Sequence, residues 1–177
     1  MRSVLFAVLF GTALALPSDA AAQESPDESL RIGTFDSRAV ALAYYRSPGV
    51  LGEMMGDMKT RHKEALAAGD TTKAEELELK GKSLQHLMHQ QVFSTGSICN
   101  LLPKFEAKLD RVAADAGLIA IVSKWELPYA TPGLQIVDVT DEVVALFEPD
   151  EEVTTMLAQM REQDPVPLED MLFDPEH

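Results

Sequence analysis

Histidine and methionine side chains are the residues of this chain that could bind a metal ion. His86 and His89 are three positions apart on one helical face, and His62 lies on the preceding helical stretch. With the neighbouring methionines they could form a soft site for copper or zinc. No cysteine or carboxylate completes the set, and both His86 and His89 fall on a polar face. We therefore expect solvated histidines, with no metal and no cofactor.

Methionines gather on one helical stretch in a pattern that suits the binding of apolar surfaces. Their side chains are flexible and polarizable, so they can adapt to many different apolar partners. The alternative is that these residues simply fill the seam between two helices. The predicted client-binding residues are Met54, Met55, Met58, Leu87 and Met88.

Residue patterns that are typical of catalysis are missing from the sequence. It holds no nucleophile-elbow glycines, no phosphate loop, no metalloprotease His-Glu pair and no two-cysteine redox motif. The single cysteine, Cys99, could be a small buried residue, an intermolecular bridge or a reactive thiol. We favour the buried residue, because the surrounding stretch is apolar and helical and has no activating His or Lys. We expect that the protein is not an enzyme.

The first 22 residues have the pattern of a cleavable secretory signal peptide. Arg2 supplies one positive charge, residues 4–16 form an apolar run, and small residues occupy positions 20–22. The run is shorter than the roughly 20 residues that a bilayer span requires. We expect cleavage near Ala22, an exported protein without a membrane span in the mature chain, and a disordered leader at 23–29. A membrane anchor that is never cleaved is the alternative.

Acidic residues are concentrated at the C-terminal end of the chain. Residues 23–137 hold 13 basic and 15 acidic side chains, whereas residues 138–177 hold one basic and 13 acidic side chains. This end would repel nucleic acids and anionic lipids, so we expect no nucleic-acid partner. Residues 148–177 are predicted to form a short helix and an acidic disordered tail.

Strand and helix patterns predict an α+β fold with a long helical arm. One helix is expected over about 50–68 and a second over about 72–116, with a weak point at 95–97. A tight turn would fold them into an antiparallel hairpin, whose arm over 50–94 stands on a base at 30–47 and 97–147. The predicted strands cover residues 30–35, 118–123 and 134–139, and the predicted short helices cover 37–46, 140–147 and 150–161.

Short motifs at both ends of this pattern resemble the Skp/OmpH family of periplasmic chaperones. Residues 32–36 (Ile-Gly-Thr-Phe-Asp) are similar to the family's first strand and its acidic stop. Residues 129–134 (Tyr-Ala-Thr-Pro-Gly-Leu) and 138–143 (Asp-Val-Thr-Asp-Glu-Val) are similar to its last strand and the start of the helix that follows. The resemblance covers about residues 30–147. It implies a periplasmic homotrimer whose strands close a shared barrel and whose arms hold unfolded outer-membrane proteins without ATP.

Closure of the sheet between chains is also expected on physical grounds. Three strands alone would leave two open edges, and pairing between protomers removes them. The predicted residues of the sheet core and trimer contact are Ile32, Phe35, Ile119, Ile121, Ile136 and Val139.

We therefore expect a periplasmic holdase that binds unfolded outer-membrane or exported proteins by weak, multivalent contacts. One alternative is a structural envelope protein that uses its coiled-coil arm to dock one folded partner. The other is a small exported metal-binding protein centred on the histidines and methionines.

Overall fold

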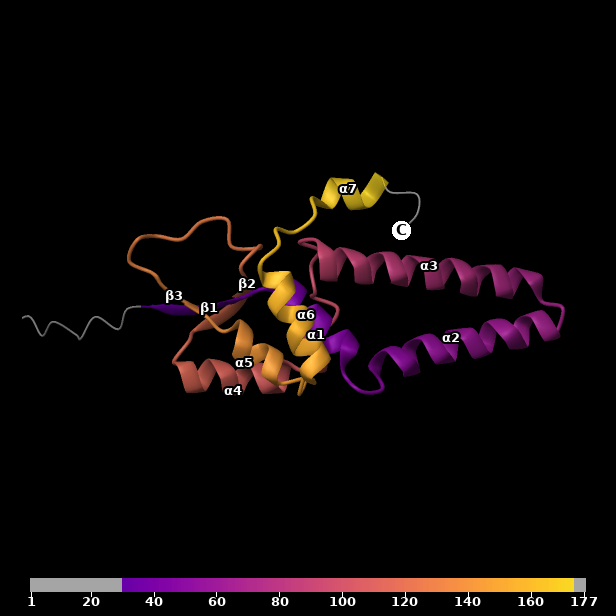
Figure 1. Cartoon of the computed structure of the whole chain (residues 1–177), viewed down its shortest axis with the longest axis horizontal. Helices are drawn as coiled ribbons and strands as arrows, with labels where there is room; N and C mark the ends of the chain where they lie inside the picture. The colour runs from indigo at the N-terminus through magenta and orange to yellow at the C-terminus, as the bar shows by residue number, and fades with distance from the viewer. Residues whose placement is uncertain (1–29, 174–177) are drawn as a thin grey trace, which may run out of the picture.

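The computed structural model describes residues 30–173 and shows the predicted mixed α+β fold. A small sheet and several short helices form the base, and two long helices project from it as an arm (Figure 1). The predicted signal peptide at 1–22, the leader at 23–29 and the tail residues 174–177 lie outside the described residues. In the part of the chain that is described, no helix has the length and apolar character needed to cross a membrane.

Three parallel strands form the sheet of the base. β1 is the central strand and pairs with β2 on one side and β3 on the other. In this register Gly33 of β1 lies between Ile121 and Val137. Because the strands run in the same direction, their carboxyl ends meet at one edge of the sheet. The strands are β1 (Arg31–Phe35), β2 (Ala120–Ser123) and β3 (Gln135–Asp138).

Gly33 allows one face of the sheet to pack closely against the base. A Cβ atom at this position would lie 2.7 Å from Leu118 Cδ1 and 3.0 Å from Val139 Cγ2. Both Leu118 and Val139 would have to move if residue 33 carried a side chain. The central strand therefore has glycine where another part of the protein approaches it.

The arm consists of two helices, α2 (Val50–Ala67) and α3 (Thr71–Phe93), that lie side by side (Figure 1). Gly69 takes part in the tight turn between them with a φ of 72°, which lies in the left-handed region that favours glycine. Near this turn the helices share only a small buried cluster. Its members are Ala65, Ala74 and Leu77.

Helix α1 (Ser37–Arg46) lies within the base and is buried along most of its length. Asp36 caps its amino end by accepting a hydrogen bond of 3.0 Å from the backbone N–H of Arg38. The small side chains of Ala39 and Ala41 are fully buried and let neighbouring elements approach α1 closely. It packs against α3 and against two further helices, α5 (Thr140–Ala145) and α6 (Glu151–Arg161), around one hydrophobic core.

The prediction of one helix over residues 72–116 is wrong. α3 ends at Phe93, and the chain runs irregularly to the 3-10 turn η1 (Leu102–Lys104) before α4 (Glu106–Ala116) begins. Gly96 folds back so that its N–H donates to the carbonyl of Gln90 at 3.2 Å. The apolar spacing continues through this break because residues on both sides of it pack into the same core.

The prediction that Cys99 is buried is also wrong. This residue is exposed in the turn after the break, where its Sγ accepts a hydrogen bond of 3.1 Å from the Ser97 hydroxyl. Its neighbours Ile98 and Leu101 are buried instead. The prediction failed because it assumed a helix where the chain forms a turn.

The acidic segment after α6 is more structured than predicted. Val166 donates its N–H to the carbonyl of Phe93 at 2.9 Å and accepts a hydrogen bond of 2.6 Å from the Ser94 hydroxyl. Helix α7 (Leu168–Phe173) follows and lies beside α3 (Figure 1). The segment could not fold alone, but the end of α3 gives it a surface on which to pack.

Candidate functional site

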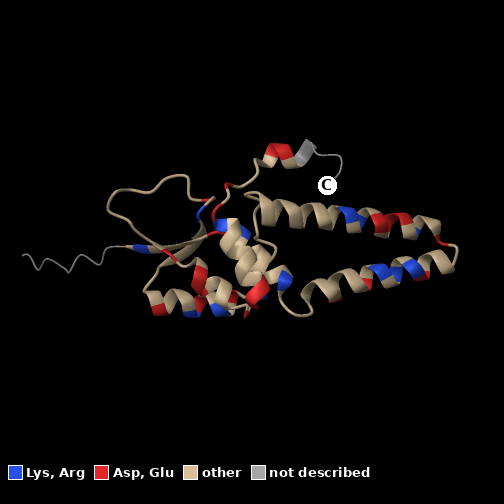
Figure 2. Cartoon of the chain, viewed as in Figure 1, with Lys and Arg blue, Asp and Glu red and all other residues tan. Residues whose placement is uncertain are grey.

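The half of the arm next to the base carries almost no charge. We call this half, residues 50–58 and 83–93, the proximal arm. Its α3 part has no charged side chain, and its α2 part has only Glu53 and Asp57. Charges of both signs are found toward the tip of the arm instead (Figure 2). The proximal arm is therefore the part best suited to contact apolar surfaces.

All five predicted client-binding residues lie in the proximal arm, but they differ in burial. Met54 and Met88 pack against the main hydrophobic core and help to join the arm to the base. Met58 is buried between the helices, Leu87 is half-buried, and Met55 is exposed over 37% of its surface. The structure thus divides them between packing positions and positions that a partner can reach.

A hollow of about 380 Å³ opens between α2 and α3 at the outer end of the proximal arm. The seam beneath the hollow is packed, since its lining residues Met58 and Leu77 are buried. The hollow is lined by Met55, Met58, Lys59, His62, Leu77, Glu78 and Gly81.

A fully buried glutamine fixes the arm to the base. The Tyr45 hydroxyl donates to Gln91 Oε1 at 2.6 Å, and burial raises the pKa of Tyr45. Gln91 Nε2 donates to the Ser97 carbonyl at 2.7 Å and to Asn100 Oδ1 at 2.6 Å. Sequence analysis missed this joint, although a glutamine at an apolar seam position is a signal that could have indicated it.

A second polar cluster lies at the carboxyl edge of the sheet and is centred on Asp36. Its side chain is 3% exposed and accepts hydrogen bonds from Arg38 Nη2 at 3.0 Å and Trp125 Nε1 at 3.2 Å. Lys124 Nζ lies 2.9 Å from Asp36 Oδ2. Burial alone would raise the pKa of Asp36, but the hydrogen bonds and charges of Arg38 and Lys124 outweigh it and lower the pKa to about 2.

This cluster has the geometry of a structural anchor. Arg38 also donates from Nη1 to the carbonyl of Gln163 at 3.0 Å. The backbone N–H of Asp36 donates to the Thr140 hydroxyl at 3.0 Å. Asp36 therefore ties β1, α1, α5 and the segment after α6 together, and its carboxylate is fully engaged with protein groups.

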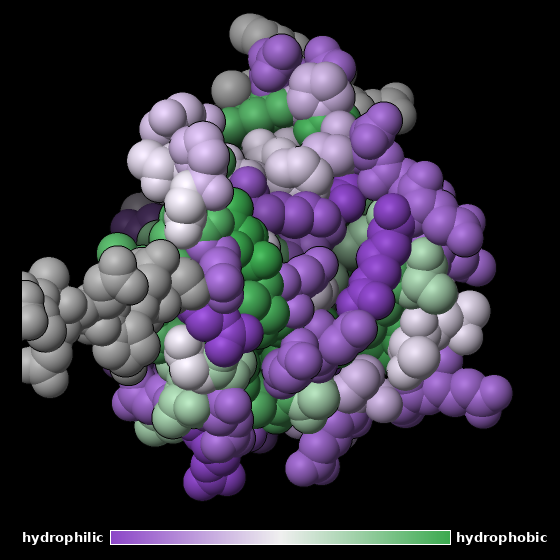
Figure 3. Space-filling model, turned by 90° about the vertical axis from the view of Figure 1, so that its left-hand side faces the viewer, coloured by the Kyte–Doolittle hydropathy of each residue, from purple (hydrophilic) through white to green (hydrophobic). Residues whose placement is uncertain are grey.

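The amino end of the sheet exposes apolar side chains. Leu30 is 59% exposed, Ile119 is 66% exposed and Ile136 is 48% exposed. Figure 3 views this end and shows hydrophobic residues gathered near the middle, with hydrophilic residues around them. The two strands at the sides of the sheet, β2 and β3, each have one edge that pairs with no other strand of the described chain.

The six predicted residues of the sheet core and trimer contact are therefore divided. Ile32, Phe35 and Val139 are buried, and Ile121 is half-buried against the core. Ile119 and Ile136 are not buried within the protomer. Their role in a trimer contact stays a prediction.

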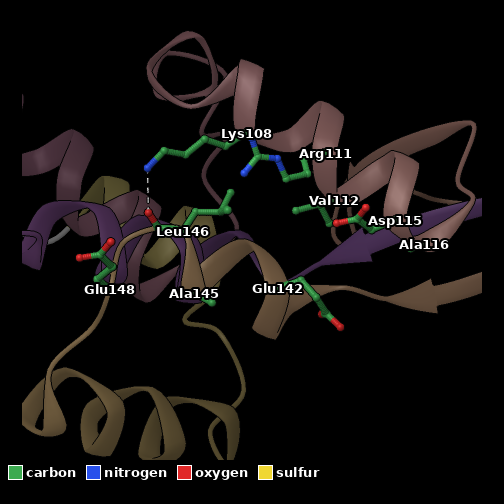
Figure 4. Close-up of a pocket in the computed structure, with 9 residues that line it drawn as sticks. All are labelled: Lys108, Arg111, Val112, Asp115, Ala116, Glu142, Ala145, Leu146 and Glu148. Atoms are coloured by element: carbon green, nitrogen blue, oxygen red, sulfur yellow. Dashed lines mark hydrogen bonds between the residues drawn. The ribbon is translucent and has the colours of Figure 1, made fainter.

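A hollow of about 600 Å³ lies between α4 and α5. Lys108 crosses it and donates to the carbonyl of Leu146 at 3.0 Å (Figure 4). Arg111 lines it together with the acidic residues Asp115, Glu142 and Glu148. Its charges are mixed in sign, so this hollow favours neither an anion nor a cation.

The three arm histidines do not come together as one site. His86 Nε2 lies 2.9 Å from Gln90 Nε2, and the His89 ring packs edge-on against Phe93 with ring centres 5.7 Å apart. His62 instead lines the hollow between α2 and α3. Across residues 30–173, no three His, Cys, Asp or Glu side chains are grouped so that they could hold a metal ion.

Comparison with known proteins gives no relative for this chain. No family model matches the sequence, and neither a curated protein nor a solved structure matches it.

Proposed function

We propose that this protein is an ATP-independent holdase chaperone of the periplasm that binds unfolded outer-membrane or other exported proteins as a homotrimer. The proposal follows the resemblance of residues 32–36, 129–134 and 138–143 to the Skp/OmpH family. The observation that carries it is the proximal arm, which is nearly uncharged and carries methionines, with a hollow between α2 and α3 at its outer end. These features suit a surface that binds apolar segments without a fixed sequence.

Binding rather than catalysis is also supported by the polar groups of the base. The pKa of Asp36 is lowered to about 2, and its oxygens are occupied by Arg38, Lys124 and Trp125. Such a group stabilises the fold and has no lone pair directed at a substrate. We therefore assign no enzymatic activity to the protein.

Trimer formation would serve this function in two ways. Pairing of β2 and β3 between protomers would remove the open edges and cover Ile119 and Ile136. It would also place three arms on one ring, so that weak contacts from each arm add up on one client chain.

An aggregation assay with several unrelated unfolded proteins tests the proposal. The protein is expected to keep each of them in solution without ATP. Met55→Glu should weaken the protection about fivefold, because a charge at an exposed apolar contact costs about 1 kcal/mol of binding. Thr60→Glu places the same charge on α2 outside the proximal arm and is the matched control, with unchanged protection. A failure to protect any client would overturn the proposal, and tight binding of a single folded protein would favour a docking role.

A further inference from the structure

The hollow between the arm helices brings together side chains that prefer soft metal ions. Met55, Met58 and His62 occupy positions i, i+3 and i+7 of α2, which lie on one face of the helix. All three line the hollow of about 380 Å³. Thioether sulfur selects Cu(I) among the biological metals, and imidazole is also a good ligand for copper.

The other polar groups of the hollow disfavour a hard divalent ion. Glu78 supplies the carboxylate, and its Oε1 is already paired with Lys82 Nζ at 2.8 Å. Lys59 also lines the hollow, and its positive charge repels a divalent cation more strongly than a monovalent one. A hard ion such as Ca²⁺ or Mg²⁺ would need several free oxygen ligands, which these residues do not offer.

The imidazole of α2 and the carboxylate of α3 face the same space. In metal sites a ligating histidine commonly donates its second N–H to a carboxylate, which orients the ring. Glu78 lines the same hollow as His62 and keeps its contact with Lys82.

We propose that this hollow binds one Cu(I) ion through the sulfur atoms of Met55 and Met58 and the imidazole of His62. Two thioethers and one nitrogen give a soft, electrically neutral set of donors, whose preference for copper rests on sulfur rather than on charge. The proposal does not depend on the holdase function, because it uses only side chains within one arm.

Competition with a chromophoric chelator tests this site. The purified protein is titrated anaerobically with Cu(I) in the presence of bicinchoninate, with Cys99→Ser in every sample because an exposed thiol binds Cu(I) by itself. We expect one equivalent per chain. Binding should weaken at least about tenfold in each of the variants Met55→Leu, Met58→Leu and His62→Asn. Loss of a group that only orients a metal ligand already lowers metal affinity by about that much, and loss of the ligand itself should lower it no less.

Matched controls lie on the same arm outside the hollow. Met88→Leu and His86→Asn remove the same donor types and should leave the affinity unchanged. Two results would overturn the proposal: no uptake by the Cys99→Ser protein, or equal affinity in the triple variant M55L/M58L/H62N. If the leucine variants do not fold, the ¹³C methyl NMR signals of the methionines in the unaltered protein test the site instead. Ag(I), added in place of Cu(I), should shift the signals of Met55 and Met58. It should leave the signals of Met156 and Met171 in place.

Discussion

At the scale of single residues, Asp36 joins parts of the base that are distant in sequence. It follows β1, caps α1, and contacts Lys124 and Trp125 after β2. Arg38 needs the Asp36 carboxylate as its counter-charge, because the Arg38 side chain is only 4% exposed. A buried cation that loses its carboxylate is left uncompensated, and breaking such a pair is strongly destabilising.

The lowered pKa of Asp36 predicts how stability changes with pH. Its value is about 2 in the folded protein and 3.8 without the fold, so the carboxylate stabilises the fold above about pH 4. That contribution, about 2 kcal/mol, should be lost as the pH falls from about 4 to about 2. Urea unfolding at a series of pH values measures this change in the free energy of unfolding.

Two variants separate the contribution of Asp36 from those of the many other acids. Asp36→Asn should lose roughly 3–5 kcal/mol at neutral pH and should show a weaker decline below pH 4 than the unaltered protein. Asp57→Asn removes an exposed partner of Arg61 and should change stability by less than about 1 kcal/mol. Equal pH profiles for Asp36→Asn and the unaltered protein would contradict the prediction.

At the scale of elements, the joint between arm and base depends on close backbone packing at Gly96. A Cβ atom there would lie 2.8 Å from the carbonyl oxygen of Gln90. Gly96→Ala should therefore destabilise the protein by about 1–3 kcal/mol, measured as the urea midpoint at constant slope. Gly56→Ala is the matched control in α2, where an added Cβ meets nothing within 4 Å and should stabilise the helix by about 0.5–1 kcal/mol. Equal midpoints for the two variants would show that the joint is not tightly packed.

Elements marked by local signals could be predicted from the sequence. The predicted helix over 37–46 coincides with α1, because Asp36 caps its start and Pro48 follows its end. The three strands were also predicted to within two residues at each end, since each is a short run of strand-forming residues between turns.

Features that depend on distant partners could not be predicted in this way. The break after Phe93 was missed because apolar spacing continues through it, and α7 was missed because its packing surface is α3. In the candidate site, the methionines stood out by composition. Gln91 did not, because its three hydrogen-bond partners come together only in the fold.

At the scale of the whole molecule, the distribution of charge separates two surfaces. The acidic C-terminal part lies on the base and along α7, whereas the proximal arm has few charges and apolar side chains gather at the amino end of the sheet (Figures 2 and 3). Repulsion between acidic surfaces keeps molecules apart except where apolar patches meet. Contacts between protomers and contacts with clients would therefore be confined to these two surfaces.

The trimer proposed above predicts that charges at the amino end of the sheet change the mass of the protein. Ile119 and Ile136 are exposed in the protomer, so their replacement by Glu should leave the fold of each chain intact. In a trimer the same charges would be buried without partners, and we expect I119E/I136E to be monomeric by light scattering behind a sizing column. Leu79→Glu adds a charge at a 67% exposed position of the arm and should keep the trimer mass. If the unaltered protein is monomeric, or if the double variant stays trimeric, this end of the sheet is not the contact between protomers.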